Sequence, residues 1–235
     1  MINFRRYKNC TKIYIPNLKL SSTSFDGFQG MTNLREIEMS PAFLRRFIAF
    51  HNLCNGCTNL TTAVCGPNVK SMNYAYFGCT NLTTAVCGPN VVNMINTYGN
   101  CRNLTTAVCG PNVTDMDTTY GKCTKLTTAV CGPNVTHMIS TYKNCTSLTT
   151  AVCGLNVKSM NDAYKNCTSL TTAVCGPNVT DMVGAFANCI KITEEVYGPN
   201  VINISGAYSG TSVTTPNYPD NITDISNLYK YCNKI

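Results

Sequence analysis

A cysteine recurs every 22 residues through most of this chain, at positions 57, 79, 101, 123, 145, 167 and 189. The residues between these cysteines are repeated with few changes, including a Gly-Pro-Asn turn at 66–68. A fixed period of roughly 20–30 residues predicts a solenoid, in which each repeat forms one coil and buries its apolar residues against neighbouring coils only.

Each repeat begins with a short segment that we expect to be extended. Segment 60–68 fits the leucine-rich-repeat pattern L-x-x-L-x-L-x-x-N, with alanine and cysteine at two of the apolar positions. A strand is expected from Thr62 to Cys65, so that Ala63 and Cys65 face the core while Thr62 and Val64 face outward.

The rest of the coil returns the chain to the next strand. Asn68 is expected to be buried, with its amide bonded to backbone groups of its own and adjacent coils. On the return arm, Val69, Met72 and Tyr76 are separated by three and four residues, which predicts one inward stripe on a helical or 3-10 arm. Because Phe186 replaces this tyrosine once, the ring is expected to matter more than the hydroxyl.

The predicted fold class is therefore an α/β solenoid. It is a leucine-rich-repeat rod of 22-residue coils with a parallel β-sheet on one face and short helical or 3-10 return arms. Residues 57–209 hold seven regular repeats, residues 1–56 hold degenerate repeats and an N-terminal cap, and residues 210–235 hold a C-terminal degenerate repeat and cap.

An aromatic stretch interrupts the degenerate N-terminal repeats. Phe43, Phe47 and Phe50 recur at helical spacing after Pro41, a residue that suits the start of a helix. This pattern predicts a capping helix over the open end of the core. Docking to a partner through the same three phenylalanines is the alternative.

The 16 cysteines allow three interpretations. Disulfides between neighbouring coils have a permitted spacing, but parallel side chains that point into one core are poorly oriented for bonding. A zinc site would need clustered ligands, and the pair Cys54 and Cys57 has no second pair or histidine to complete it. The favoured interpretation is that cysteine serves as a small, soft hydrophobic residue with a free thiol.

The charge and the apolar pattern argue against several classes of protein. The net charge is +7, but the 18 basic residues form no run, so specific nucleic-acid recognition is not expected, although a mild attraction to polyanions remains an alternative. No apolar stretch reaches the ~20 residues that a membrane span needs. The positively charged start of the chain is followed by no apolar run, so no signal peptide is expected.

The chemistry that catalysis needs is nearly missing from the sequence. Its only histidines are His51 and His137, and it contains no phosphate-binding glycine loop and no plausible nucleophile–base pair. We therefore expect a protein that is not an enzyme and that has no catalytic residue, no cofactor and no metal site.

The repeat resembles a known family. The stretch from 179 to 189 is similar to the phrase V-T-x-M-x-x-x-F-x-x-C of the BspA-like leucine-rich repeats, and the similarity covers roughly residues 57–232. The coil is shorter here than is usual in that family, and cysteine replaces an aliphatic strand residue. Such repeats occur in bacterial surface adhesins, protozoan surface proteins and phage or viral proteins, so the resemblance implies binding or attachment.

Ligands of leucine-rich repeats usually contact the exposed strand residues. Here these positions hardly vary between coils, which would suit a glycan chain, another repetitive ligand or a second copy of the chain. The candidate ligand-binding residues are Thr62, Val64, Thr84, Val86, Thr106, Val108, Thr128, Val130, Thr150 and Val152. The candidate partner-docking residues are Phe43, Phe47 and Phe50.

Two functional hypotheses follow. The absent signal, the free thiols and the abrupt C-terminus favour a structural or receptor-binding component of a phage or virus particle, assembled in the cytoplasm with a protein partner. The alternative is a bacterial or protozoan cell-surface adhesin that binds a host protein or a glycan.

Overall fold

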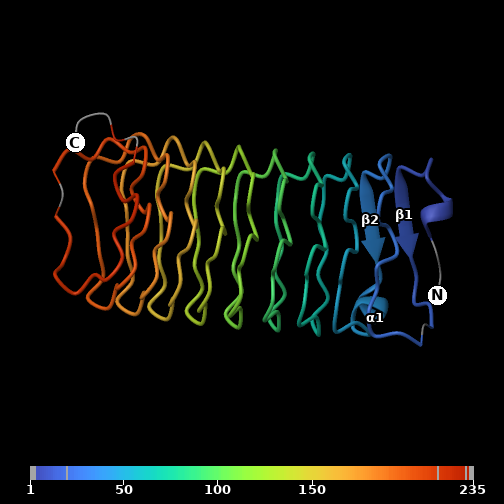
Figure 1. Cartoon of the computed structure of the whole chain (residues 1–235). Helices are drawn as coiled ribbons and strands as arrows, with labels where there is room; N and C mark the ends of the chain where they lie inside the picture. Colours follow the sequence, from blue (N-terminus) through green and yellow to red (C-terminus); the bar gives the residue numbers. More distant parts are fainter. Residues whose placement is uncertain (1–3, 20, 216, 231, 233–235) are drawn as a thin grey trace.

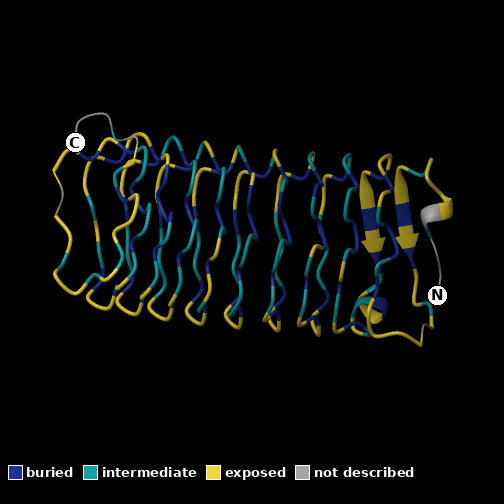
Figure 2. Ribbon diagram, in the orientation of Figure 1, coloured by how far each residue is buried: buried dark blue, intermediate teal, exposed yellow. Residues whose placement is uncertain are grey.

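Successive repeats stack as coils along one axis, and the two ends of the chain lie at opposite ends of the resulting rod (Figure 1). This computed structural model describes residues 4–19, 21–215, 217–230 and 232. The last three residues of the predicted C-terminal cap, 233–235, lie outside the described residues. Buried positions recur at the same place in coil after coil, as Figure 2 shows.

Four apolar positions of the repeat form rows, or ladders, that run the length of the rod. Every member of these ladders is fully buried, which confirms the predicted inward stripe. The ladders are Leu60/82/104/126/148/170 with Ile192, Val69/91/113/135/157/179/201, Met72/94/116/138/160/182 with Ile204, and Tyr76/98/120/142/164 with Phe186 and Tyr208. Burial of this much apolar surface between neighbouring coils stabilises the rod.

The aromatic ladder does more than fill the core. Neighbouring rings from Tyr76 to Tyr208 stack with their centroids 5.5–5.7 Å apart. The Tyr76 hydroxyl also accepts a hydrogen bond from the Val64 N–H at 2.8 Å and donates one to the Val64 carbonyl at 2.6 Å. The other tyrosines of the ladder repeat this pair of bonds. The expectation that the ring matters more than the hydroxyl overlooked this crosslink.

Regular secondary structure is confined to the N-terminal coils of the described chain. It comprises the 3-10 helix η1 (Phe4–Arg6), the strands β1 (Lys12–Ile15) and β2 (Glu36–Met39), and the helix α1 (Pro41–Leu44). The two strands pair in parallel, with Lys12 opposite Glu36. Alternation along both strands buries every second residue.

The predicted strand does not form in the regular coils. Between residues 62 and 175 the extended segments pair through single parallel bridges only, which join Thr84, Thr106, Thr128, Thr150 and Thr172. The physical reason is a competition for the backbone. The N–H and C=O of valines such as Val64 are bonded to the tyrosine hydroxyl of their own coil, so these groups do not extend the sheet.

The return arm is predicted to be helical or 3-10, but no helix is assigned to it in the regular coils, and it instead carries most of the hydrogen bonds that join the coils. In the first regular coil, the N–H groups of Met72, Tyr74, Tyr76 and Gly78 all donate to carbonyls of the next coil, at 2.8–3.0 Å. The alternate N–H groups form local turns, as Ala75 does with the Met72 carbonyl at 2.9 Å. The same pattern recurs in the following coils, and the parallel bridges on this arm run without a break from Ser24 to Asp224.

This arm requires two residues per coil with positive φ. In the first regular coil they are Tyr74, at 57°, and Gly78, at 72°. A left-handed conformation is costly for most residues and least so for glycine and asparagine. The corresponding positions accordingly hold many of these two types: Asn52, Gly56, Asn96, Asn100, Asn144, Asn166, Gly184, Asn188, Gly206, Gly210 and Asn227.

The asparagine of the Gly-Pro-Asn turn has the predicted bond but not the predicted burial. Asn90 donates from Nδ2 to the carbonyl of Pro67 in the preceding coil at 2.7 Å, and its counterparts repeat this bond. However, Asn68 and Asn90 are exposed. The turn projects beyond the core, so the amide joins neighbouring coils at the surface.

The predicted capping helix is also corrected. Helix α1 has only four residues, begins after the N-cap Ser40, and follows β2, so the coil that contains β1 lies between it and the N-terminal end (Figure 1). Phe43, Phe47 and Phe50 are fully buried. Their rings belong to an internal aromatic cluster with Phe25 and Phe28, and Phe4 of η1 packs against the last two.

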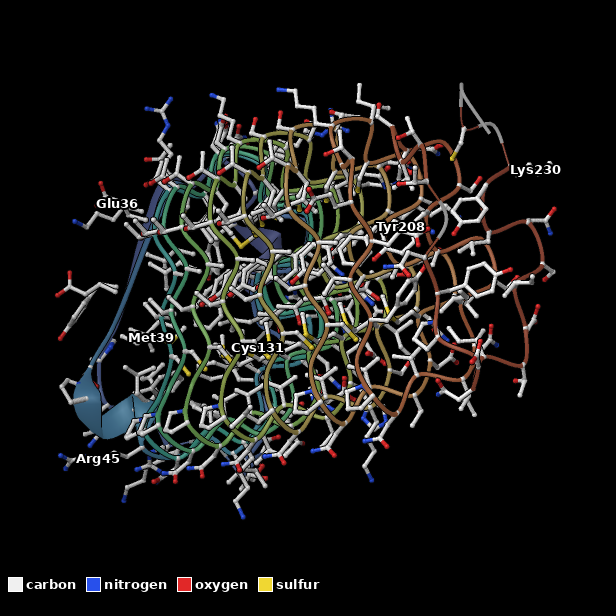
Figure 3. All side chains as sticks on the ribbon, turned by 90° about the vertical axis from the view of Figure 1, so that its left-hand side faces the viewer. Glu36, Met39, Arg45, Cys131, Tyr208 and Lys230 are labelled. Atoms are coloured by element: carbon white, nitrogen blue, oxygen red, sulfur yellow. The ribbon has the colours of Figure 1, made fainter. Side chains whose placement is uncertain are left out.

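The cysteines are free thiols, as predicted. The cysteines that mark the 22-residue period, Cys57/79/101/123/145/167/189, are buried and donate from Sγ to a backbone carbonyl of an earlier coil, as Cys123 does to Tyr98 at 3.1 Å. The cysteines of the extended segments, Cys65/87/109/131/153/175, are half-buried and contact the methionine ladder, with 3.7 Å between Cys131 Sγ and Met138 Sδ. Figure 3 shows Cys131 and Tyr208 within the stack and Arg45 at its edge.

The hydroxyl crosslink can be tested at Tyr120, whose counterpart in a later coil is naturally phenylalanine. Tyr120→Phe should lower the free energy of unfolding by about 1–2 kcal/mol, because the Val108 N–H and C=O lose their partner. Tyr120→Ala should cost about 3–5 kcal/mol, since it also empties a buried site. Urea unfolding measures both, and Phe186→Tyr is the matched control, which should not destabilise. An unchanged stability in Tyr120→Phe would contradict the role of the hydroxyl.

The buried thiols predict a loss of stability in mild alkali. Burial raises the pKa of Cys109 to about 12 and raises the pKa values of Cys123 and Cys145 well above that of an ordinary thiol. Unfolded thiols ionise near a pH of about 8.5, whereas folded ones stay protonated, so ionisation favours the unfolded chain as the pH rises above that value. Urea midpoints should therefore fall between about pH 8.5 and 10.5, and less steeply in Cys109→Ala. Equal midpoints across that range would refute this prediction.

Candidate functional site

The exposed positions of the predicted strand are the threonines. Thr62, Thr84, Thr106, Thr128, Thr150 and Thr172 are all exposed, and we call this row the threonine face. The bridges between neighbouring coils hold the threonines from Thr84 to Thr172 in one line. For this row the sequence correctly predicted which way the side chains point.

The valines that were predicted beside them are placed differently. Val64, Val86, Val108, Val130 and Val152 are half-buried rather than exposed. Most of them pack against the core, and their backbone groups are bonded to the tyrosine hydroxyls. The valines therefore support the face, and only a part of each side chain can contact a ligand.

Sequence reasoning missed a second exposed row directly beside the first. Thr61, Thr83, Thr105, Thr127 and Thr149 are exposed too. Several of their hydroxyls donate to a carbonyl of the preceding coil, as Thr149 does to Thr127 at 3.3 Å. No such bond is found for the hydroxyls of the threonine face itself, as far as the described part of the chain extends, so these hydroxyls are available to a ligand or to water.

A second surface lies along the Gly-Pro-Asn turns. Here a groove with a volume of about 660 Å³, the asparagine groove, is lined by Lys70, Asn90, Val92, Asn112, Thr114, Asn134, Thr136, Asn156 and Lys158. The asparagines use Nδ2 to bond to the preceding coil. A lysine, Lys70 or Lys158, lies at each end of the groove. Because Asn68 and its counterparts were predicted to be buried, the sequence did not predict this surface.

The two histidines are far apart in the stack and have structural contacts. His51 Nε2 lies 2.8 Å from Ser71 Oγ, and His137 Nδ1 lies 3.0 Å from Thr136 Oγ1. Within residues 4–19, 21–215, 217–230 and 232, no group of three or more His, Cys, Asp or Glu side chains is arranged to hold a metal ion. Over those same residues, no helix has the length and apolar character to cross a bilayer.

The three phenylalanines predicted to dock a partner are not surface residues. Phe43, Phe47 and Phe50 are brought together as predicted, with ring centroids 4.9 Å apart for the first pair and 5.7 Å for the second. Because all three are fully buried, a partner could not contact them without opening the coil.

Solved structures share this architecture. The chain matches a leucine-rich repeat protein from Bacteroides ovatus with a TM-score of 0.65 at 16% identity, over 90% of this chain and 52% of that one. It matches one from Eubacterium ventriosum with a TM-score of 0.65 at 20% identity, over 92% of this chain and 62% of that one. A leucine rich cell surface protein from Faecalibacterium prausnitzii matches with a TM-score of 0.58 at 16% identity, over 99% and 73% of the two chains.

These likenesses establish the fold. The chain spans 52% and 62% of the first two of those proteins. No curated protein sequence gives a match. The family model for the BspA type leucine rich repeat region, in six copies, matches residues 2–127 and 120–235. Since these matches cover nearly the whole sequence, the chain belongs to the BspA-type leucine-rich-repeat family.

Proposed function

We propose that this chain is a non-enzymatic binding module of a bacterial cell surface, and that it holds a repetitive glycan chain along its threonine face. The observation that carries the proposal is the uniformity of that face, where one exposed hydroxyl recurs in six of the seven regular coils, and bridges fix its spacing from Thr84 to Thr172. A ligand with its own short repeat can contact several coils in the same way.

The chemistry of the face suits a carbohydrate. Its groups are neutral hydroxyls that both donate and accept hydrogen bonds, beside the partly exposed methyl groups of the valine row. Sugar rings present the complementary combination of hydroxyls and C–H surfaces. Each coil would contribute little, and a long chain would gain affinity because further contacts become intramolecular.

The comparisons favour the cell-surface alternative over the virion hypothesis. The solved structures that resemble this chain are bacterial, and one is described as a cell surface protein. Nothing in the family model or in these structures supports a component of a phage or virus particle.

A chain-length series of oligosaccharides tests the proposal. Binding of β-1,4-linked glucan oligomers to the intact protein, measured by calorimetry, should strengthen as the oligomer lengthens. Arginine at Thr106 and Thr150, two exposed positions that are not adjacent, should block the face and weaken binding of the longest oligomer at least ~10-fold, or about 1.4 kcal/mol.

The control places the same two charges on the other surface. Thr114→Arg with Thr180→Arg should leave the affinity unchanged, because Thr114 lines the asparagine groove and Thr180 occupies the same repeat position. If the control loses affinity and the threonine-face variant does not, the groove is the binding surface. If neither the length of the oligomer nor the Thr106 and Thr150 changes matter, the proposal is wrong.

A further inference from the structure

A second, smaller hollow interrupts the return arm near the middle of the rod. Its volume is about 390 Å³, within the range of small-molecule sites. It is lined by Phe77, Asn96, Gly99, Asn100, Thr118, Gly121, Lys122, Lys143 and Asn144. We call it the glycine hollow, and it belongs to neither the threonine face nor the asparagine groove.

The hollow exists because two successive coils have glycine where their neighbours have a side chain. Phe77, Gly99, Gly121 and Lys143 occupy the same position of the repeat. The Phe77 ring leans over Gly99 so closely that a Cβ there would lie 2.8 Å from Cδ2 of the ring. At Gly121 the nearest side-chain atom to an added Cβ would be 3.4 Å away. The two glycines thus form the floor, and the ring forms an apolar wall.

A ladder of asparagine side chains ends at this hollow. Asn188 donates from Nδ2 to Oδ1 of Asn166 at 2.8 Å, and Asn166 donates in the same way to Asn144 at 2.7 Å. The preceding coil has Lys122 at this position, so the Nδ2 group of Asn144 has no asparagine to bond there. Successive amide bonds polarise one another, which strengthens the donor end of such a chain. That donor end belongs to a residue that lines the hollow.

Positive charge surrounds the same point. Lys122 is exposed, and no ion pair of its ammonium group is found among the described residues. Lys143 is partly neutralised by Asp162, whose carboxylate lies 2.7 Å from Nζ. Arg102 donates from Nε to Oδ1 of Asn100 at 3.0 Å, which leaves the Nδ2 group of Asn100 available. The hollow therefore combines a cation and amide donors with an aromatic wall.

We propose that the glycine hollow binds a carboxylate-bearing sugar ring. The carboxylate would bind the Lys122 ammonium and the Asn144 amide, and one C–H face of the ring would pack on Phe77. Charge-assisted bonds of this kind are the stronger class of hydrogen bond. The inference rests on the proposed function only in assigning the ligand to the glycans, and it deepens that function by specifying an acidic residue in a glycan.

Lys122→Asn is the decisive variant because it should not harm the fold. Lys122 has a φ of 64°, and asparagine occupies this position, also with positive φ, in several other coils. The substitution supplies the missing rung of the ladder while it removes the charge. D-glucuronate should bind the intact wild-type protein and shift the side-chain amide signals of Asn100 and Asn144 in NMR spectra. Lys122→Asn should weaken this binding at least ~10-fold without a fall in thermal stability.

Three comparisons decide the proposal. Lys158→Ala, which removes one charge at the end of the asparagine groove, should bind glucuronate as the wild type does. Glucose should bind at least ~10-fold more weakly than glucuronate because it lacks the carboxylate. Acetate should also bind at least ~10-fold more weakly, because it lacks the ring. Equal loss in Lys122→Asn and Lys158→Ala would indicate non-specific charge and overturn the site. Equal binding of glucose or acetate would overturn the ligand class, as would no detectable binding of glucuronate.

The result is independent of the threonine face. Binding of neutral oligosaccharides should persist in Lys122→Asn, because Lys122 does not belong to that face. Conversely, arginine at Thr106 and Thr150 should leave glucuronate binding intact. Each proposal can thus fail while the other stands.

Discussion

The whole stack depends on the hydrogen bonds of the return arm. In each of the first six regular coils, four N–H groups reach forward to carbonyls of the next coil, and the chain must take a left-handed conformation twice to present them. That requirement limits the residues that the arm tolerates and places each coil directly above its neighbour. The even spacing of the stacked rings, 5.5–5.7 Å, and the straight rows of surface side chains follow from it.

The opposite side of the coil is held by side chains instead of a sheet. Tyrosine hydroxyls bond the extended segments across the core, and the adjacent glycine allows neighbouring coils to approach closely. A Cβ at Gly132 would lie 2.7 Å from Cys109 Sγ and 3.1 Å from the Gly110 carbonyl. A small thiol and a missing side chain are therefore complementary features of one tight contact. The repetition of both in the sequence reflects packing in the core, whereas the exposed threonines beside them are not required by it.

The 22-residue period predicts which side chains are buried better than it predicts which backbone groups pair. The Leu, Val, Met and aromatic ladders and the free thiols could all be predicted, because a position that is apolar in every repeat must face the common core. The sequence does not predict that the return arm, instead of the expected strand, carries the hydrogen bonds between coils. The reason is that the Tyr76 hydroxyl competes for the backbone groups of Val64 from 12 residues away. Positive φ at Tyr74 and Lys122 has no sequence signal, because neither residue type favours it.

The two candidate sites also differ in how far the sequence alone can predict them. The threonine face follows from alternation along an extended segment, so sequence alone could place it. The glycine hollow depends on the neighbours of two glycines in three dimensions, namely the Phe77 ring in one coil and Lys143 in another, and on the end of the asparagine ladder. The uniform rows result from the repeat, and the departures from the repeat at Phe77, Lys122 and Lys143 bring differing side chains together at the glycine hollow.

Most of the hydrogen bonds that join the return arms of neighbouring coils run in one direction, which gives this arm an electrical dipole. In an ordinary sheet the peptide dipoles of a strand alternate and nearly cancel. Here four N–H groups of a coil, such as those of residues 72, 74, 76 and 78, point toward the C-terminal end, whereas fewer, such as those of Lys70 and Ser71, point toward the N-terminal end. Each peptide unit has a dipole of about 3.5 D, and aligned units add as they do in a helix. The excess of forward-pointing N–H groups leaves the return arm polar along the axis of the rod, with its partial positive pole toward the C-terminal coils.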